Sequence, residues 1–185
     1  MSNIPNLVYL APTTKEEYLA MLDWSIEQKD YPVAIKVPGG QFISDGKTVS
    51  KDFSRLNTYE ITERGSDVAI IGLGGFYHLG KEVAILLKES TGINATIVNP
   101  YYITGLDQNT LNGLKENHKV VITLEDGFLD GGFGQKISGF YGNTDMKVLN
   151  YGIKTEFLDR YNLEKVLRDN HLTPKQIVED IKENL

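Results

Sequence analysis

From Asp67 to the C-terminus, short apolar runs alternate with stretches in which apolar residues recur every three or four positions. The strands expected in this region lie at 68–71, 95–98, 120–124 and 147–150. Strands that alternate with helices predict a largely parallel sheet, because each helix returns the chain to the edge at which the next strand starts. We therefore expect an α/β domain over residues 66–185, with helices on both faces of the sheet.

Residues 1–40 predict a smaller strand-helix-strand unit. The apolar run 7–11 predicts a strand, and Thr13 followed by Glu16 has the spacing of a capping box, which marks the start of a helix. Residues 32–37 predict a second strand.

Two strands bury too little apolar surface to form a stable sheet alone. We therefore expect residues 7–10 and 33–37 to expose apolar side chains and to self-associate through their strand edges. Residues 41–65 are polar and rich in turn-forming residues, and they predict an interdomain linker.

Composition excludes several classes of function. The formal net charge is -6, which disfavours a nucleic-acid partner because binding to phosphates requires clustered basic residues. The chain has no Cys and its three His lie far apart, so neither a disulfide framework nor a zinc site is expected. The sequence has neither a signal-peptide pattern nor an apolar run long enough for a bilayer, and we expect a cytoplasmic protein without a membrane partner.

A glycine-rich segment, Gly72 to Tyr77, follows a predicted strand and precedes a predicted helix. It lacks the third glycine of a dinucleotide-binding fingerprint, and the next strand ends in Asn99 rather than in an acid, so nicotinamide binding is disfavoured. A tight turn is the favoured interpretation. The free amides around Gly74 and Gly75 could still receive an anion.

A second polar segment follows the strand 120–124. Glu125 and Asp126 are adjacent on a strand and point to opposite faces, which disfavours a paired-carboxylate site and favours a solvated turn or a subunit interface. The following glycines, Gly131 and Gly132 before Phe133, lack the lysine and hydroxyl of a phosphate-binding loop. We expect them to let the next helix approach another backbone closely, within the domain or across an interface.

Together these motifs resemble the transketolase family, most closely its 1-deoxyxylulose-5-phosphate synthase branch. The matching segments are 4–8, 11–12, 32–40, 67–74, 98–100, 105–107, 121–127 and 131–134. The resemblance implies that residues 1–40 are the tail of a pyrimidine-binding domain and that residues 66–185 are the C-terminal domain, with a mixed five-stranded sheet. In that family the C-terminal domain mainly supports architecture and dimerisation.

The resemblance also implies that the chain is one part of a larger enzyme. The family holds magnesium and thiamine diphosphate with a Gly-Asp-Gly motif and a following Asn, which neither 44–46 nor 125–127 supplies. The glutamate that activates the cofactor would lie upstream of Met1. We therefore expect no catalytic residue, metal or cofactor in this chain, and partnership with the missing diphosphate- and pyrimidine-binding domains, on the same parent chain or a separate subunit, in a homodimer.

The chain departs from the family pattern at a position that bears on the substrate. The synthase typically has Tyr-Pro-Arg-Gly where this chain has Val37-Pro38-Gly39-Gly40, and Gly39 cannot offer the charged fork with which the family arginine holds a phosphate. This predicts a divergent transketolase-like transferase of two-carbon units, unless Lys36 compensates beside Gly39 and Gly40. Two alternatives remain: an independent anion-binding regulatory module at 72–75 or 125–134, and a domain of a 2-oxo acid dehydrogenase beta subunit.

Overall fold

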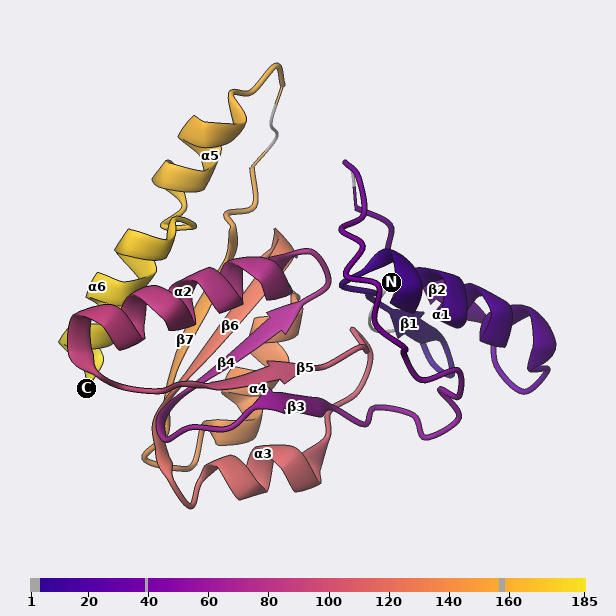
Figure 1. Cartoon of the computed structure of the whole chain (residues 1–185), viewed down its shortest axis with the longest axis horizontal. Coiled ribbons are helices and arrows are strands. Elements are labelled where there is room, and N and C mark those ends of the chain that lie inside the picture. Colours follow the sequence, from indigo (N-terminus) through magenta and orange to yellow (C-terminus); the bar gives the residue numbers. More distant parts are fainter. Residues whose placement is uncertain (1–3, 39, 157–158) are drawn as a thin grey trace.

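The computed structural model describes residues 4–38, 40–156 and 159–185, which form two sheets in separate parts of the chain (Figure 1). The N-terminal part consists of β1 (Val8–Leu10), α1 (Lys15–Glu27) and β2 (Val33–Ile35). The larger part consists of β3 (Glu60–Glu63), β4 (Asp67–Leu73), α2 (Phe76–Thr91), β5 (Thr96–Asn99), α3 (Gln108–Leu114), β6 (His118–Phe128), α4 (Phe133–Tyr141), β7 (Lys147–Ile153), α5 (Leu163–Asp169) and α6 (Pro174–Asn184). In these described residues, no helix has the length and apolarity needed to cross a membrane.

The larger sheet has five strands in the order β3-β5-β4-β6-β7. β4 pairs in parallel with both β5 and β6, β6 pairs in parallel with β7, and β3 runs antiparallel to β5 at one edge. The predicted α/β class with a mixed, mostly parallel five-stranded sheet is therefore confirmed.

Alternate residues of the central strands point to opposite faces of the sheet, as the pleat requires. Val68 and Ile70 of β4 pack with the buried side chains of α2 and α6, whereas Ala69 and Ile71 pack with those of α3 and α4. All four β4 side chains are fully buried. Helices thus cover both faces, and this is why the central strands read as continuous apolar runs.

The fifth strand, β3, lies within the segment 41–65 for which only a linker was predicted. It pairs with β5 in the register Glu60 to Asn99 and Ile61 to Val98. Only Ile61 of β3 is partly buried and apolar. An edge strand held mainly by backbone hydrogen bonds has no alternating apolar pattern, so its sequence does not distinguish it from a linker.

The N-terminal part packs against the larger part through the outer edge of β1. The Ala11 amide donates to the Tyr101 carbonyl over 2.7 Å, and the Ile103 amide donates to the Tyr9 carbonyl over 2.8 Å. Leu10 is fully buried in a cluster with the side chains of α1, Phe53 and Tyr102. The expected exposure of residues 7–10 is therefore wrong, because a loop more than ninety residues away covers this edge.

We expect Leu10→Ala to lower the free energy of unfolding by about 2–5 kcal/mol, the usual cost of truncating a fully buried leucine. The same truncation at the exposed Leu163, which lies outside this cluster, should change it by less than about 0.5 kcal/mol. Urea denaturation of both variants measures the difference. Equal losses would mean that β1 does not dock onto the larger part.

Candidate functional site

The carboxyl ends of β4, β5 and β6 lie at one edge of the larger sheet, and the N-terminal part lies over this edge (Figure 1). This edge is where open parallel sheets place their ligands. Here each strand end instead contacts the N-terminal part: Gly74 after β4, Asn99 of β5 and Asp126 of β6. The candidate site is therefore a junction between the two parts of one chain.

The first contact of the junction is a buried carboxylate, Glu17. One of its oxygens accepts from the Thr13 amide over 2.6 Å, and the other accepts from the Asn99 side-chain amide over 3.0 Å. Thr14 is the N-cap of α1 and its hydroxyl accepts from the Glu17 amide. The capping pair is thus Thr14 with Glu17, one residue later than the predicted Thr13 with Glu16.

Burial raises the pKa of Glu17, and the hydrogen bond from Thr13 opposes this rise. The side chain is only 7% exposed. A buried carboxylate is tolerated where donors satisfy it, so the Glu17 to Asn99 bond holds α1 at the end of β5.

A second buried carboxylate, Glu125, lies at the end of β6. Its two oxygens accept from the Phe133 and Gly134 amides, each over 2.9 Å. These amides lie in the first turn of α4 and have no hydrogen-bond partner within the helix itself. The helix dipole also favours a negative charge at this position. The glycine-rich segment is therefore a cradle for an anion, and the anion is the chain's own glutamate.

The glycines around α4 allow this close approach. A Cβ atom at Gly132 would lie 2.6 Å from both Glu125 oxygens, and one at Gly134 would lie 2.5 Å from the Thr123 hydroxyl oxygen. These glycines let the start of α4 lie close to side chains of β6, whereas the predicted approach to another backbone, within the domain or across an interface, stays a prediction. The expectation of a solvated or interface position is wrong for Glu125, which is 5% exposed, and for Phe133, which is fully buried. Gly131 is exposed and Gly132 is half-buried, and their part in an interface stays a prediction.

Burial raises the pKa of Glu125, while the two amides and the nearby Lys36 and Lys136 lower it. Lys36, at the end of β2, donates to the Asp126 carbonyl oxygen, and its ammonium lies 3.8 Å from the Asp126 carboxylate. Lys36, Glu125 and Asp126 thus form one charged cluster that joins the end of β2 to β6.

Of the residues predicted to lie near a substrate or an anion, Lys36 is therefore already paired within the chain. Gly40 is exposed, and Gly39 lies outside the described residues. Anion binding at these positions stays a prediction.

The turn before α2 supplies the third contact of the junction. Gly74 has a left-handed φ of 56°, and a Cβ atom there would lie 3.4 Å from the Ala11 Cβ. Its carbonyl and that of Gly75 accept from the Tyr77 and His78 amides. The exposed Gly75 has open space around it, and an anion at the start of α2 stays a prediction.

Two cavities border the junction. The larger, of about 890 Å³, lies between residues 43–55 and the surface of β3, β5 and α2, and its lining includes Glu17, Glu60 and His78. His78 Nε2 lies 2.8 Å from the Thr13 carbonyl oxygen, and Tyr101 donates its hydroxyl to Glu60, so these groups are engaged with protein neighbours.

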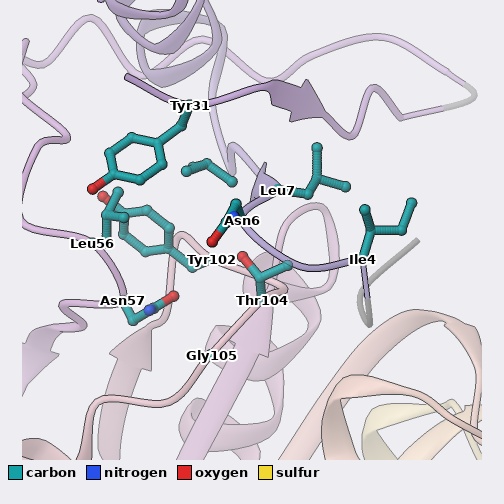
Figure 2. A pocket seen from close by; sticks show the side chains of 10 residues that line it. Ile4, Asn6, Leu7, Tyr31, Leu56, Asn57, Tyr102, Thr104 and Gly105 are labelled. Atoms are coloured by element: carbon teal, nitrogen blue, oxygen red, sulfur yellow. The ribbon is translucent and has the colours of Figure 1, made fainter. Parts of the chain in front are cut away.

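The smaller cavity, of about 330 Å³, lies between the start of the chain and the loop after β5 (Figure 2). Asn6, Asn57 and Gly105 in its wall all have left-handed φ angles. Its described lining includes apolar side chains, amides and hydroxyls and carries no charged group. This cavity offers neither an acid-base pair nor a metal ligand set.

Comparison with known proteins places these features in a family. The family model of the transketolase C-terminal domain matches residues 57–177. The 1-deoxy-D-xylulose-5-phosphate synthase of Clostridium acetobutylicum is 36% identical over 168 residues, which cover 89% of this chain and 26% of that protein. The same enzyme of Clostridium tetani is 29% identical over 183 residues, which cover 98% of this chain and 29% of that protein. The chain thus spans less than a third of these relatives.

Two solved structures share the fold. One is described as "Split gene transketolase, inactive beta4 tetramer" and superposes with a TM-score of 0.81 at 21% identity, covering 100% of this chain and 60% of that one. A transketolase mutant from Pichia stipitis superposes with a TM-score of 0.64 at 14% identity, covering 97% and 25%. At these identities the comparison establishes the common fold.

We expect Glu17→Gln to change how stability depends on pH. Because burial raises the pKa of Glu17 in the folded state, wild-type stability falls as pH rises from the unfolded value of 4.5 toward neutrality, and the glutamine variant lacks this decline. The neighbouring Glu16→Gln is a control of opposite sign, since the Ser44 hydroxyl lowers the Glu16 pKa. A lowered pKa acts below pH 4.5, where its stabilisation is lost as the pH falls, so the Glu16 variant differs from the wild type in slope only there. Urea unfolding from below pH 4.5 up to neutrality tests both variants. Identical pH profiles for the wild type and the Glu17 variant would refute the effect.

We expect Gly132→Ala to destabilise the chain by roughly 1–3 kcal/mol, because the added methyl group displaces the Glu125 carboxylate from the α4 amides. Gly139→Ala, in the same helix and with open space around it, should instead stabilise it by about 0.5–1 kcal/mol. Thermal unfolding distinguishes the two. A neutral Gly132 variant would mean that Glu125 does not cap α4.

Proposed function

The chain belongs to the transketolase C-terminal domain family, and we propose that it is the architectural and dimerisation part of a thiamine-diphosphate-dependent, transketolase-like enzyme. In this proposal, residues 66–185 form the C-terminal domain and residues 1–40 are the tail of a pyrimidine-binding domain. Residues 41–65 connect them and supply β3. The parent enzyme transfers a two-carbon unit in the cytoplasm, in a reaction like that of 1-deoxyxylulose-5-phosphate synthase; the 36% identity to such a synthase supports this choice.

The observation that carries the proposal is the unfinished sheet formed by β1 and β2. The Val8 amide donates to the Pro32 carbonyl oxygen, and the Lys36 amide donates to the Leu10 carbonyl oxygen. The backbone polar groups of residues 32 and 36, on either side of β2, therefore point toward β1. Hydrogen bonding alternates along a strand, and Val33 and Ile35 therefore direct their amides to the opposite edge. No strand pairs with that edge within residues 4–38, 40–156 and 159–185.

A sheet of two strands with an unpaired edge is a template for further strands. The junction fixes this template on the larger part through Glu17, Lys36 and the loop 101–104. This arrangement supports a role in which the chain presents the edge of β2 to the remainder of a pyrimidine-binding domain, carried by the parent chain or by a separate subunit.

The residues of this chain do not fit the diphosphate and magnesium of the cofactor. In the described part of the chain, no three acidic or histidine side chains gather as a metal site. The anion cradle at α4 is filled by Glu125, whose charge would repel a diphosphate. We therefore assign cofactor binding and the catalytic groups to the missing domains.

The alternative functions have less support. An anion-binding regulatory module would use the glycine segments, but Glu125 occupies one of them and the Lys36 charge is paired with Asp126. The identity to the synthases favours the transketolase class over a 2-oxo acid dehydrogenase beta subunit.

We expect thiamine diphosphate with magnesium to give no binding heat when titrated into the chain alone, and saturable binding after the missing diphosphate- and pyrimidine-binding part is added. Isothermal titration calorimetry measures both states. Val33→Pro, which removes an outward amide of β2, should weaken the reconstituted binding, whereas Leu163→Ala should not. Cofactor binding by the chain alone would refute the assignment.

A further inference from the structure

The smaller cavity at the junction is built from three separate segments of the chain (Figure 2). Residues 4–8 form one wall, residues 56–57 before β3 form the second, and residues 102–105 after β5 form the third. Tyr31, from the loop between α1 and β2, completes the described lining. A volume of about 330 Å³ lies within the range of small-molecule sites. A ligand in this cavity would therefore contact both parts of the chain at once.

Asn57 holds its side-chain amide in the cavity wall without a hydrogen-bond partner in the described chain. Its φ is 58°, in the left-handed region, and the facing Gly105 has a left-handed φ of 71°. A Cβ atom at Gly105 would lie 2.3–2.4 Å from the Cγ, Nδ2 and Oδ1 atoms of Asn57. The carboxamide therefore lies flat across the bare Gly105 backbone, and the edge that carries its donor and acceptor stays free.

Asn6 and Thr104 bring further polar groups to the same space. Asn6 also has a left-handed φ, of 61°, and its carboxamide forms no hydrogen bond with the described residues. The Thr104 hydroxyl oxygen accepts from the Tyr9 amide over 3.2 Å, which leaves the hydroxyl proton for another acceptor. Figure 2 shows the polar ends of Asn6, Asn57 and Thr104 turned toward the cavity.

The two asparagines indicate that the cavity is shaped for an occupant. A left-handed φ costs free energy in a residue other than glycine, and such conformations cluster at ligand sites. At Asn6 and Asn57 this cost yields no side-chain hydrogen bond within the part of the chain that the structure describes. The Tyr59 amide donates to the Asp107 carboxylate over 2.9 Å and so fixes the segment that carries Asn57. The binding groups are already in place, and a ligand does not have to order them.

The lining determines the charge and the shape of the occupant. Its described residues carry no charged group, and an ion would lose its hydration there without a counter-charge. An extended peptide is disfavoured as well, because the Leu7, Val8 and Tyr102 amides in the wall already donate to carbonyl groups of the chain. Apolar side chains and the Tyr31 ring remain for the faces of a ligand, and the carboxamides remain for its edge.

We propose that this cavity binds a neutral planar heterocycle that carries a hydrogen-bond donor next to an acceptor, the pattern found on the edge of adenine. The Asn57 carboxamide pairs with both groups at once, as asparagine does with adenine in nucleic-acid recognition. The Tyr31 ring and the apolar side chains of Leu7 and Leu56 pack on the faces of the heterocycle. The Thr104 hydroxyl donates to a further ring nitrogen.

Such a ligand acts as an effector of the junction. It contacts Asn6 and Tyr31 of the N-terminal part, and it contacts Asn57 and Thr104 of the remaining chain. A molecule that binds only the folded state stabilises that state, so occupancy strengthens the docking of the unfinished β1–β2 sheet onto the larger part. This inference does not depend on the reaction of the parent enzyme.

Isothermal titration of adenine into the full chain tests the proposal. The wild type should bind adenine saturably, with a dissociation constant of about 1 mM or lower. Purine, which lacks the exocyclic amino donor, should bind about tenfold more weakly. Asn57→Asp preserves the shape of the side chain and tolerates the left-handed backbone, but it puts a second acceptor where the amide donor was. This variant should weaken adenine binding about tenfold or more.

Matched variants separate binding from folding. Asn143→Asp makes the same change at an exposed asparagine outside the cavity and should leave the dissociation constant unchanged. Tyr31→Ala should weaken binding about tenfold through the loss of the ring, whereas Tyr31→Phe should bind as the wild type does. Circular dichroism of each variant checks that it is folded.

Three results would each overturn the proposal: no saturable binding of adenine by the wild type, equal affinity for adenine and purine, or unchanged affinity in the Asn57 variant. The titration uses this chain alone and no thiamine diphosphate, so its failure leaves the proposed function standing. Failure of cofactor binding on reconstitution would in turn leave this cavity and its ligand unaffected.

Discussion

Two buried carboxylates hold this structure together at one edge of the larger sheet. Burying a carboxylate is costly unless donors surround it, so Glu17 and Glu125 restrict the backbone that supplies those donors. Glu17 binds the Thr13 amide and Asn99, and so joins α1 to β5. Glu125 binds the first amides of α4, and so sets the path of the chain after β6. The positions of the helices at this edge follow from these few bonds.

The same bonds support the architectural role proposed for this edge. In open parallel sheets, free helix amides at the carboxyl edge commonly bind an anionic ligand. Here the chain supplies its own anion at α4 and its own counter-charge at Lys36. An edge that is satisfied internally can serve as a fixed joint between two parts, which agrees with an architectural role.

Much of the larger domain was predictable because its central strands are buried on both faces. The segments Val68–Ile71 and Val120–Leu124 are almost entirely apolar, and this alone predicts buried strands at these positions. The edge strand β3 was missed, since only Ile61 marks it.

The candidate site was harder to predict, because its contacts depend on distant residues. The sequence Thr13-Thr14-Lys15-Glu16-Glu17 contains two overlapping capping boxes, and local pattern cannot choose between them. The fold selects the box with Glu17, because Asn99 of β5 donates a hydrogen bond to the Glu17 carboxylate. Likewise, the glycines before α4 predicted a close approach, but their partner Glu125 became evident only in the fold.

The covering of β1 by the loop after β5 has a consequence for the order of folding. The partners of Tyr9 and Leu10 lie at 102–104, and that of Lys36 lies at Asp126, so these contacts close long loops of chain. Loop closure of this kind must follow formation of the sheet that presents the partners. During synthesis, β1 and β2 therefore become ordered only after β5 and β6 have been made, and their apolar strands stay accessible to chaperones until then.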